Sequence, residues 1–298
     1  MSPRHAFIPR EIGSIVIGGL GLALAASPRV ARAVDPFEIQ VYDATANAPG
    51  TPGLELHLNT VPSGTRDAPP PELPAHHQSH FTLEPSLGVR PWWELGGYFQ
   101  MALTGDGSFR YAGVKLRSKF VTVPSFHREW RLGLNFELSR VPEAFEPDRW
   151  GGEVRPMAVW ENEHWLLAVN PIVEVSLAGA GAKAGPSFAP ALMAKFKIRD
   201  AVALGVEYYA DLGPIAAPVP LKRQEQYLFE AIDLLSIPHF ELNAGVGEGL
   251  TDASNGLIVK VILGYAWESV RLWGRGAPVS SMHRTLRGAS GRTARAIE

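Results

Sequence analysis

The chain of 298 residues carries 28 Lys and Arg against 30 Asp and Glu, and it has no cysteine. The lack of cysteine excludes a disulfide framework and lipoprotein attachment. Residues 34–267 hold 18 basic against 27 acidic side chains, whereas residues 268–298 hold six Arg against two Glu. We therefore expect an acidic body with a basic tail. We expect no nucleic-acid partner, because the tail arginines lack interleaved aromatics.

Residues 1–33 are predicted to be a secretory signal peptide. Basic side chains precede an apolar run over 12–26, and Ala31 and Ala33 then stand in the order that signal peptidase recognises. The run of about 15 residues is short for a membrane-spanning helix, and a retained anchor is the alternative. Cleavage after Ala33 would leave about 265 residues, enough for one large all-β domain in an exported protein.

Residues 34–52 are predicted to be an N-terminal lead-in segment. Within them, "PFEIQVYDAT" over 36–45 alternates apolar and polar side chains like a strand. Joining it to a barrel of 12 strands would make the strand number odd, which bacterial barrels avoid. Three placements stay open: a periplasmic lead-in, a plug in the lumen, or one strand of a 14-strand barrel.

From residue 53 to residue 267, apolar and polar side chains alternate in segments separated by Gly, Pro, Asp and Asn. In "WRLGLNFEL", 130–138, one face is Trp, Leu and Phe, and the other is Arg, Gly, Asn and Glu. A soluble sandwich also alternates and is the alternative, but a face mixing both charge signs with Gly, Asn, Gln and Tyr is typical of a crowded lumen. Two segments are weak: 152–160 contains Pro156, and 226–236 has no clean apolar face.

Connector lengths give an independent test of the barrel. Long connectors such as 62–78 and 141–152 alternate with short ones such as 90–91, and 123–128 is the one poor fit. Bacterial outer-membrane barrels have short periplasmic turns, longer outer loops and an even number of strands. The sequence therefore predicts an all-β transmembrane antiparallel up-and-down β-barrel of about 12 strands (12–14) over residues 53–267, in the cell outer membrane. Outer-membrane lipids and the barrel-assembly machinery are its expected partners.

Aromatic side chains gather at the strand ends that this topology assigns to the periplasmic side. Such rings belong at the membrane interface, where one edge is apolar and the other is wet. The predicted interface aromatics are Trp93, Trp130, Trp160, Trp165, Tyr265 and Trp267.

Five stretches carry a family resemblance: "FEIQVYD", "GLELHLN", "VNPIVEV", "GVEYYADLG" and "GLTDASNGLIVKVILGYAW". They resemble a broad group of Gram-negative outer-membrane β-barrels whose nearest labelled relatives are transporters grouped with the meta-pathway of phenol degradation. The similarity covers roughly residues 36–267. It implies a barrel with a transport role and carries over no catalytic or ligand residue.

The inward faces of the predicted strands collect charges of both signs. Fixed charges along a water-filled path set the field that a permeant solute meets. The residues predicted to line this path are Glu55, Glu94, Lys115, Arg117, Lys119, Arg131, Glu137, Glu174, Lys195, Glu207, Asp211, Glu241 and Lys260. The same groups could instead pair across strands and fill a closed core. We expect a passive channel or transporter for small-molecule solutes, and the alternative is a non-conducting structural or adhesion barrel.

The sequence offers little support for an enzyme. "HHQSH", 76–80, puts three histidines and Ser79 in an outer loop, which could bind a metal or serve a hydrolase. Histidines in a proline-rich loop are usually solvated, so we assign no catalytic residue and no metal. "GVGEG", 245–249, ends a strand instead of opening a helix, so it predicts no nucleotide, and we expect no cofactor.

The C-terminal residues 268–298 are predicted to be a basic, disordered tail, because Gly, Ser, Ala and Arg dominate them. A sharper hypothesis places the tail arginines in the acidic lumen.

Overall fold

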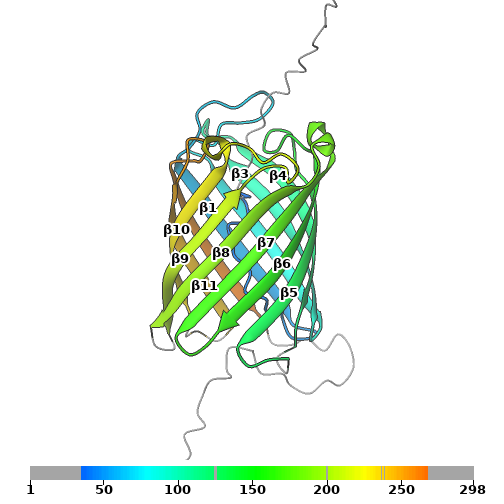
Figure 1. Cartoon of the computed structure of the whole chain (residues 1–298), viewed down its shortest axis with the longest axis vertical. Coiled ribbons are helices and arrows are strands. Elements are labelled where there is room, and N and C mark those ends of the chain that lie inside the picture. The colour runs from blue at the N-terminus through cyan, green and yellow to red at the C-terminus, as the bar shows by residue number, and fades with distance from the viewer. Residues whose placement is uncertain (1–34, 124–125, 199–200, 236, 238, 268–298) are drawn as a thin grey trace, which may run out of the picture.

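The computed structural model describes residues 35–123, 126–198, 201–235, 237 and 239–267. These residues form a closed barrel of tilted antiparallel strands (Figure 1). Within these ranges, no helix is both long enough and apolar enough to cross a membrane. The predicted signal peptide and the predicted basic tail lie outside the described residues.

In the described part of the chain, twelve strands make the barrel, and β1 pairs with β12 to close it. The bounds are β1 Pro52–Ser63, β2 Ser79–Arg90, β3 Trp93–Leu103, β4 Phe109–Val121, β5 Trp130–Arg140, β6 Trp150–Glu161, β7 Trp165–Ala178, β8 Ser187–Ile198, β9 Val202–Asp211, β10 Glu225–Leu234, β11 Phe240–Gly249 and β12 Leu257–Ala266. Two short 3-10 turns, η1 Ala180–Lys183 and η2 Leu221–Arg223, lie in loops. The predicted 12-strand antiparallel barrel is confirmed.

The two ends of the barrel differ in the length of their connections. Residues 64–78, 141–149 and 212–224 connect strands at one end, which we call the long-loop end. Residues 91–92 and 162–164 connect strands at the opposite end, which we call the short-turn end. In known outer-membrane barrels the short turns face the periplasm.

β12 shows how the alternating sequence builds the wall. Val259, Val261 and Leu263 lie on the outer face, whereas Lys260 between them is 0% exposed inside the barrel. Successive side chains of a strand point to opposite faces, so a slip of one residue would turn the lysine outward. The apolar row therefore fixes both the sidedness and the register of the strand.

The weak segment around Pro156 is a strand with an interrupted ladder. In β6, Pro156 faces Leu134 of β5, while the pairing with β7 passes from Val154 directly to Ala158. Proline has no N–H to donate to a neighbouring strand. The barrel wall tolerates this residue because the ladder resumes on both sides of it.

The predicted interface aromatics stand at the short-turn end. Trp130, Trp165, Tyr265 and Trp267 expose between 43% and 46% of their surface. Trp93 stacks on Phe120 with ring centroids 6.2 Å apart. Their contact with the membrane interface stays a prediction.

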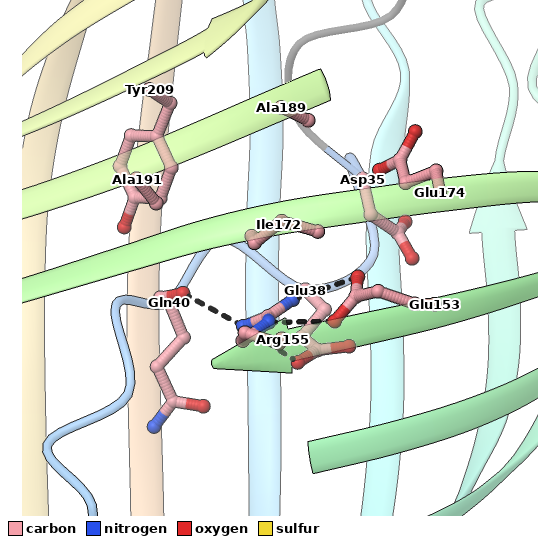
Figure 2. A pocket seen from close by; sticks show the side chains of 10 residues that line it. All are labelled: Asp35, Glu38, Gln40, Glu153, Arg155, Ile172, Glu174, Ala189, Ala191 and Tyr209. Atoms are coloured by element: carbon pink, nitrogen blue, oxygen red, sulfur yellow. Dashed lines mark hydrogen bonds and ion pairs between the residues drawn. The ribbon is translucent and has the colours of Figure 1, made fainter. Parts of the chain in front are cut away.

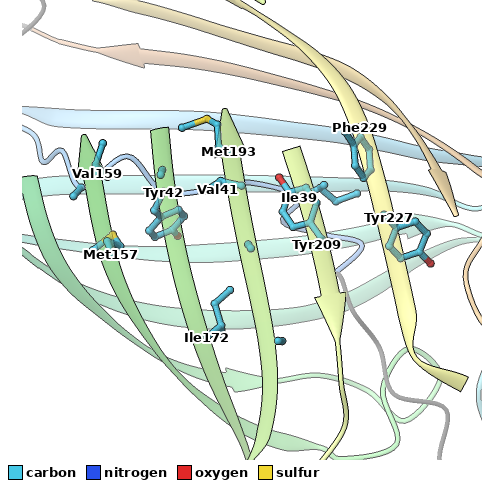
Figure 3. Close-up of a cluster of buried hydrophobic side chains, with 14 of the residues drawn as sticks. Ile39, Val41, Tyr42, Met157, Val159, Ile172, Met193, Tyr209, Tyr227 and Phe229 are labelled. Atoms are coloured by element: carbon cyan, nitrogen blue, oxygen red, sulfur yellow. The ribbon is translucent and has the colours of Figure 1, made fainter. Parts of the chain in front are cut away.

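Residues 35–51 lie in the lumen and form no strand; we call them the plug. Ile39, Val41 and Tyr42 of the plug pack against apolar side chains that point inward from the wall (Figure 3). These wall residues include Met157, Val159, Ile172, Met193, Tyr209, Tyr227 and Phe229. Of the three placements that the sequence leaves open, the described residues take the second: the segment lies inside the lumen, and neither outside the barrel nor in its wall. The segment gains burial on both of its faces, which a lead-in outside the barrel would not have.

Candidate functional site

The plug runs along the lumen from the long-loop end to the short-turn end. Near its start, the Phe37 ring packs against Phe145 of the loop 141–149, with centroids 5.7 Å apart. Near its end, the backbone N–H of Asn47 donates to Glu94 Oε2 at 2.6 Å, and the chain then continues into β1 at Pro52. The plug therefore occupies the length of the lumen that a solute would have to cross.

A glycine in the wall lets the plug backbone approach closely. A Cβ atom at Gly88 of β2 would lie 2.2 Å from the carbonyl oxygen of Ala48 and 2.3 Å from that of Asn47. In the space this leaves, the Gly50 amide donates to Gly88 O at 2.7 Å, and the Gly88 amide donates to Thr51 O at 3.1 Å. Only glycine allows this contact without moving the plug.

Lys115 of β4 holds the acidic start of the plug. Its Nζ lies 2.5 Å from Asp35, 3.3 Å from Glu38 and 3.2 Å from Glu137 of β5. Burial alone would raise the pKa of Asp35, but the Lys115 ammonium outweighs this effect and holds that pKa below its ordinary value. Asp35 is therefore a carboxylate at neutral pH and is ion-paired to the wall.

Arg155 of β6 makes a second attachment (Figure 2). Its guanidinium lies 3.6 Å from Glu38, donates to the main-chain oxygen of Gln40 at 3.2 Å, and pairs with Glu153 at 2.7 Å. Beside these groups, a cavity of about 20 Å³ remains between the plug and the wall. That volume holds about one water molecule. This cavity is too small for an organic solute.

Tyr42 is the most closely held side chain of the plug. Its hydroxyl donates to Glu38 at 2.7 Å and shares a 2.6 Å hydrogen bond with the hydroxyl of Tyr98. Its backbone N–H donates to Asn170 Oδ1 at 2.7 Å, and its carbonyl accepts from Asn170 Nδ2 at 3.1 Å. Burial, together with the carboxylates of Glu38 and Glu137, raises the pKa of Tyr42 well above its usual range, so the phenol stays neutral.

Three wall cations surround the Tyr42 ring. The charged groups of Arg155, Lys119 and Arg117 lie 4.3, 5.4 and 5.8 Å from its centroid. Cations within about 6 Å of an aromatic face are attracted by the ring quadrupole. The lumen thus contains a socket for a phenol ring, which the chain fills with its own tyrosine.

A separate group of charges lies across β8, β9, β10 and β12. Lys195 contacts Glu207 at 2.8 Å and Asp233 at 2.8 Å, and Lys260 is ion-paired to the same Glu207. Lys260 also donates to the carbonyl oxygen of Ile39 at 3.0 Å. Most of the contacts in this group join one wall strand to another.

The thirteen charged residues predicted to line a solute path all stand on inward-facing positions of their strands. Glu94, Lys115, Arg117, Lys195, Glu207 and Lys260 are buried, and they form ion pairs with one another or with the plug. Glu241, in contrast, is exposed in the lumen near the short-turn end. Their role in conducting a solute stays a prediction.

Several residues that hold the plug were missed from the sequence. They are Tyr98, Arg155 and Asn170, with Tyr42 on the plug itself. Each of the three wall residues has the same inward position in its strand as the charged residues that were selected, so strand parity was the available signal. Tyr98 and Asn170 carry no charge, and Arg155 stands directly before Pro156 in a segment whose strand pattern is weak.

The histidines of 76–80 do not assemble a catalytic pair. Ser79 and His80 are successive residues of β2, so their side chains point to opposite faces. Ser79 Oγ lies 3.0 Å from Thr60 Oγ1, and His80 Nε2 lies 3.0 Å from Gln78 Oε1. The rings of His76 and His77 stack on each other, 3.9 Å apart. This geometry does not support the serine hydrolase considered from the sequence.

Comparisons with known proteins bear on the fold. No protein-family model matches the sequence, and no curated protein matches it. Among solved structures, an outer membrane channel from Pseudomonas putida F1 is similar, with a TM-score of 0.55 and 12% identity over 77% of this chain and 100% of that chain. The KdgM porin gives a TM-score of 0.48 and 9% identity over 72% of this chain and 99% of that chain. The first similarity shows that the chain has the fold of an outer-membrane β-barrel.

Proposed function

We propose that the protein is a passive outer-membrane channel for small solutes, and that the plug closes it in the conformation described here. One observation carries this proposal: the material that fills the charged lumen is a separate chain segment. Between Asp35 and the start of β1, the plug contacts the wall only through side chains, hydrogen bonds and ion pairs. Such contacts can break without unfolding the barrel, and their loss would leave a lumen lined by charges of both signs.

A second candidate is a non-conducting structural or adhesion barrel. The observation in its favour is the dense packing of the plug, since Phe37, Glu38 and Ile39 are each 3% exposed or less. A permanently packed lumen would behave as the core of the barrel and not as a path. The two candidates differ in what removal of the plug does to conductance.

The second part of the proposal names the protein group and the class of solute. The motif "FEIQVYD", which carries part of the resemblance to transporters grouped with phenol degradation, is the plug sequence 37–43. We propose membership in that group and small phenolic compounds as the first solutes to test. The socket around Tyr42 supports this class, because it already accommodates a phenol ring among cations.

The proposed location is the outer membrane, which the chain would reach by means of the signal peptide 1–33. Outer-membrane lipids would cover apolar side chains of the outer face such as Leu116 and Phe99, which are 68% and 57% exposed. The barrel-assembly machinery would insert the chain.

The test is single-channel current in planar bilayers for three proteins: the processed chain, a variant lacking the plug residues 35–48, and a variant lacking the tail 268–298. We expect rare or no openings for the processed chain and frequent discrete steps for the plugless variant. The tail deletion is the matched control, and it should behave like the processed chain. Heat-modifiable migration on SDS gels checks that each variant is folded.

If the folded, inserted variant without the plug carried no current, the channel proposal would be overturned and the structural barrel favoured. If current steps appeared on deletion of the tail alone, residues 268–298 would be the segment that closes the barrel. Liposome swelling with phenol and with a sugar of similar size then tests the solute class.

A further inference from the structure

Four inward-facing side chains form a square on β1 and β2. Glu55 stands directly opposite Glu84, and His57 stands directly opposite Thr82. All four point into the lumen because they alternate with the outward-facing Leu54, Leu56 and Leu83. The register of two neighbouring strands thus brings two carboxylates, an imidazole and a hydroxyl together.

The distances within this square suit a metal ion. His57 Nε2 lies 3.0 Å from Glu84 Oε2 and 3.7 Å from Glu55 Oε2, and the three ligand atoms lie within 4.8 Å of one another. Zinc binds histidine nitrogen and carboxylate oxygen at about 2.0–2.2 Å, which puts its tetrahedral ligands roughly 3.4 Å apart. Small side-chain movements would satisfy all three bonds.

Unsatisfied polar atoms in the square are a second, independent observation. Thr82 is 0% exposed, and its Oγ1 has no hydrogen-bond partner among the described residues. A buried hydroxyl without a partner carries a desolvation penalty of about 1–3 kcal/mol, which a bound ligand or its coordinated water relieves. Thr82 stands next to His57 across the strand pair, on the edge of the square that no carboxylate occupies.

The plug supplies a further oxygen atom. The side-chain nitrogen of Gln40, Nε2, donates to Glu55 Oε2 at 3.4 Å. Rotation of that amide by half a turn exchanges nitrogen for oxygen, and it would then present a carbonyl ligand to the same point. A metal held here would connect the plug to the wall.

The surroundings orient the ligands and leave a way in. Arg117 Nη2 lies 2.7 Å from Glu84 Oε1, which leaves Glu84 Oε2 available to the ion. Arg117 would thus act as an outer-shell partner, a residue that orients a metal ligand without contacting the metal. The side chain of Glu55 is 25% exposed. The square is therefore reached by solvent at Glu55.

We propose that Glu55, His57 and Glu84 bind a divalent cation of the zinc class inside the lumen. The cation takes the place of the proton between His57 Nε2 and Glu84; in the bound state the neutral imidazole carries its one ring proton on Nδ1, and a second ring proton, where the imidazole was protonated, leaves to solvent. This site is distinct from the histidines of 76–80, to which the sequence analysis assigns no metal.

The test is a Zn²⁺ titration of the processed chain in detergent, purified without a histidine tag, against a chromophoric chelator. Visible absorption of bound Co²⁺ reports the ligand geometry independently. We expect one Zn²⁺ per barrel, and binding weaker by about tenfold or more in Glu55→Gln and in His57→Gln. Glu55→Gln is the safer variant, because Glu55 is the least buried of the three ligands.

The matched control is the double variant His76→Ala/His77→Ala, which removes two loop imidazoles and should bind like the unchanged protein. Absence of binding by folded protein would overturn the proposal, as would binding that survives both ligand variants. Loss of binding in the loop variant would place the ion at 76–80 instead. Since binding is measured without current, its outcome is independent of whether the barrel conducts.

Discussion

Two groups of charged side chains in the lumen differ in their partners: one forms ion pairs between the plug and the wall, and the other forms ion pairs between wall strands. The plug-holding group consists of Lys115, Glu137, Glu153 and Arg155 on β4, β5 and β6, together with the plug acids Asp35 and Glu38. The wall-holding group consists of Lys195, Glu207, Asp233 and Lys260 on β8, β9, β10 and β12. Removal of the plug breaks several ion pairs of the first group and leaves those of the second intact. The ion pairs of the first group therefore depend on the plug, whereas those of the second join wall strands to one another.

Glu207→Gln should have the largest effect, and it acts on stability. Glu207 is the shared partner of Lys195 and Lys260, which are 3% and 0% exposed in their side chains. Loss of one partner of a buried ion pair leaves an uncompensated charge and costs about 3–5 kcal/mol. Urea unfolding in lipid vesicles, followed by tryptophan fluorescence, measures this loss.

The control for that variant is Glu163→Gln. Glu163 lies in a turn with 79% of its side chain exposed, so its replacement should change stability by about 0.5 kcal/mol or less. Equal effects of the two substitutions would show that the wall-holding group does not stabilise the barrel.

Asp35→Asn should have an intermediate effect, on opening and not on unfolding. Lys115 keeps Glu38 and Glu137 as partners, so the loss is about 1 kcal/mol, or about fivefold in the fraction of open channels. The same carboxylate predicts a pH dependence. Its pKa is lowered from 3.8, so its contribution to plug binding is complete above that pH and is lost as the pH falls through the lowered pKa.

Open probability recorded from pH 7 down to pH 3 checks both statements. In the unchanged protein, protonation of Asp35 should add to the open probability as the pH falls below about 3.8, and Asp35→Asn should lack that component of the rise. A variant that opens no more often at neutral pH than the unchanged protein would show that Asp35 does not hold the plug.

Asp43→Asn should have the smallest effect. Asp43 lies 3.9 Å from Arg131, and its side chain is 35% exposed. Partly exposed ion pairs contribute about 0–1 kcal/mol and are screened by salt. We expect less than about a fivefold change in open probability, smaller than for Asp35→Asn in paired recordings at the same salt. The reverse order would place the main attachment of the plug near the short-turn end.

The sequence predicted the wall well and the plug poorly, for a physical reason. Alternation at period two requires only that one face meet an apolar medium and the other a polar one, so it identified even the strand that contains Pro156. Residues 36–45 show the same alternation, yet Phe37, Glu38 and Ile39 are all buried. A segment surrounded by a mixed lumen buries both of its faces, and no local pattern distinguishes this from a strand.

The candidate site was predictable only in part. Strand parity places Lys195 and Glu207 in the lumen without a structure, but the pair between Lys195 and Asp233 spans β9, which lies between their strands. Contacts of this kind depend on the register and tilt of the closed barrel. The same holds for Tyr42 and Asn170, which are 128 residues apart in sequence.

The seam between β1 and β12 has a consequence for assembly order. The plug precedes every strand in the sequence and is therefore synthesised first. The wall beside it is completed only when the last strand, β12, pairs with the first, β1. Until then the nascent sheet is open on one side. The plug can therefore settle sideways against β3 to β9, and no free end has to thread through a finished cylinder. Because Lys260 of β12 binds both Glu207 and the plug carbonyl of Ile39, pairing of the last strand also secures the enclosed segment.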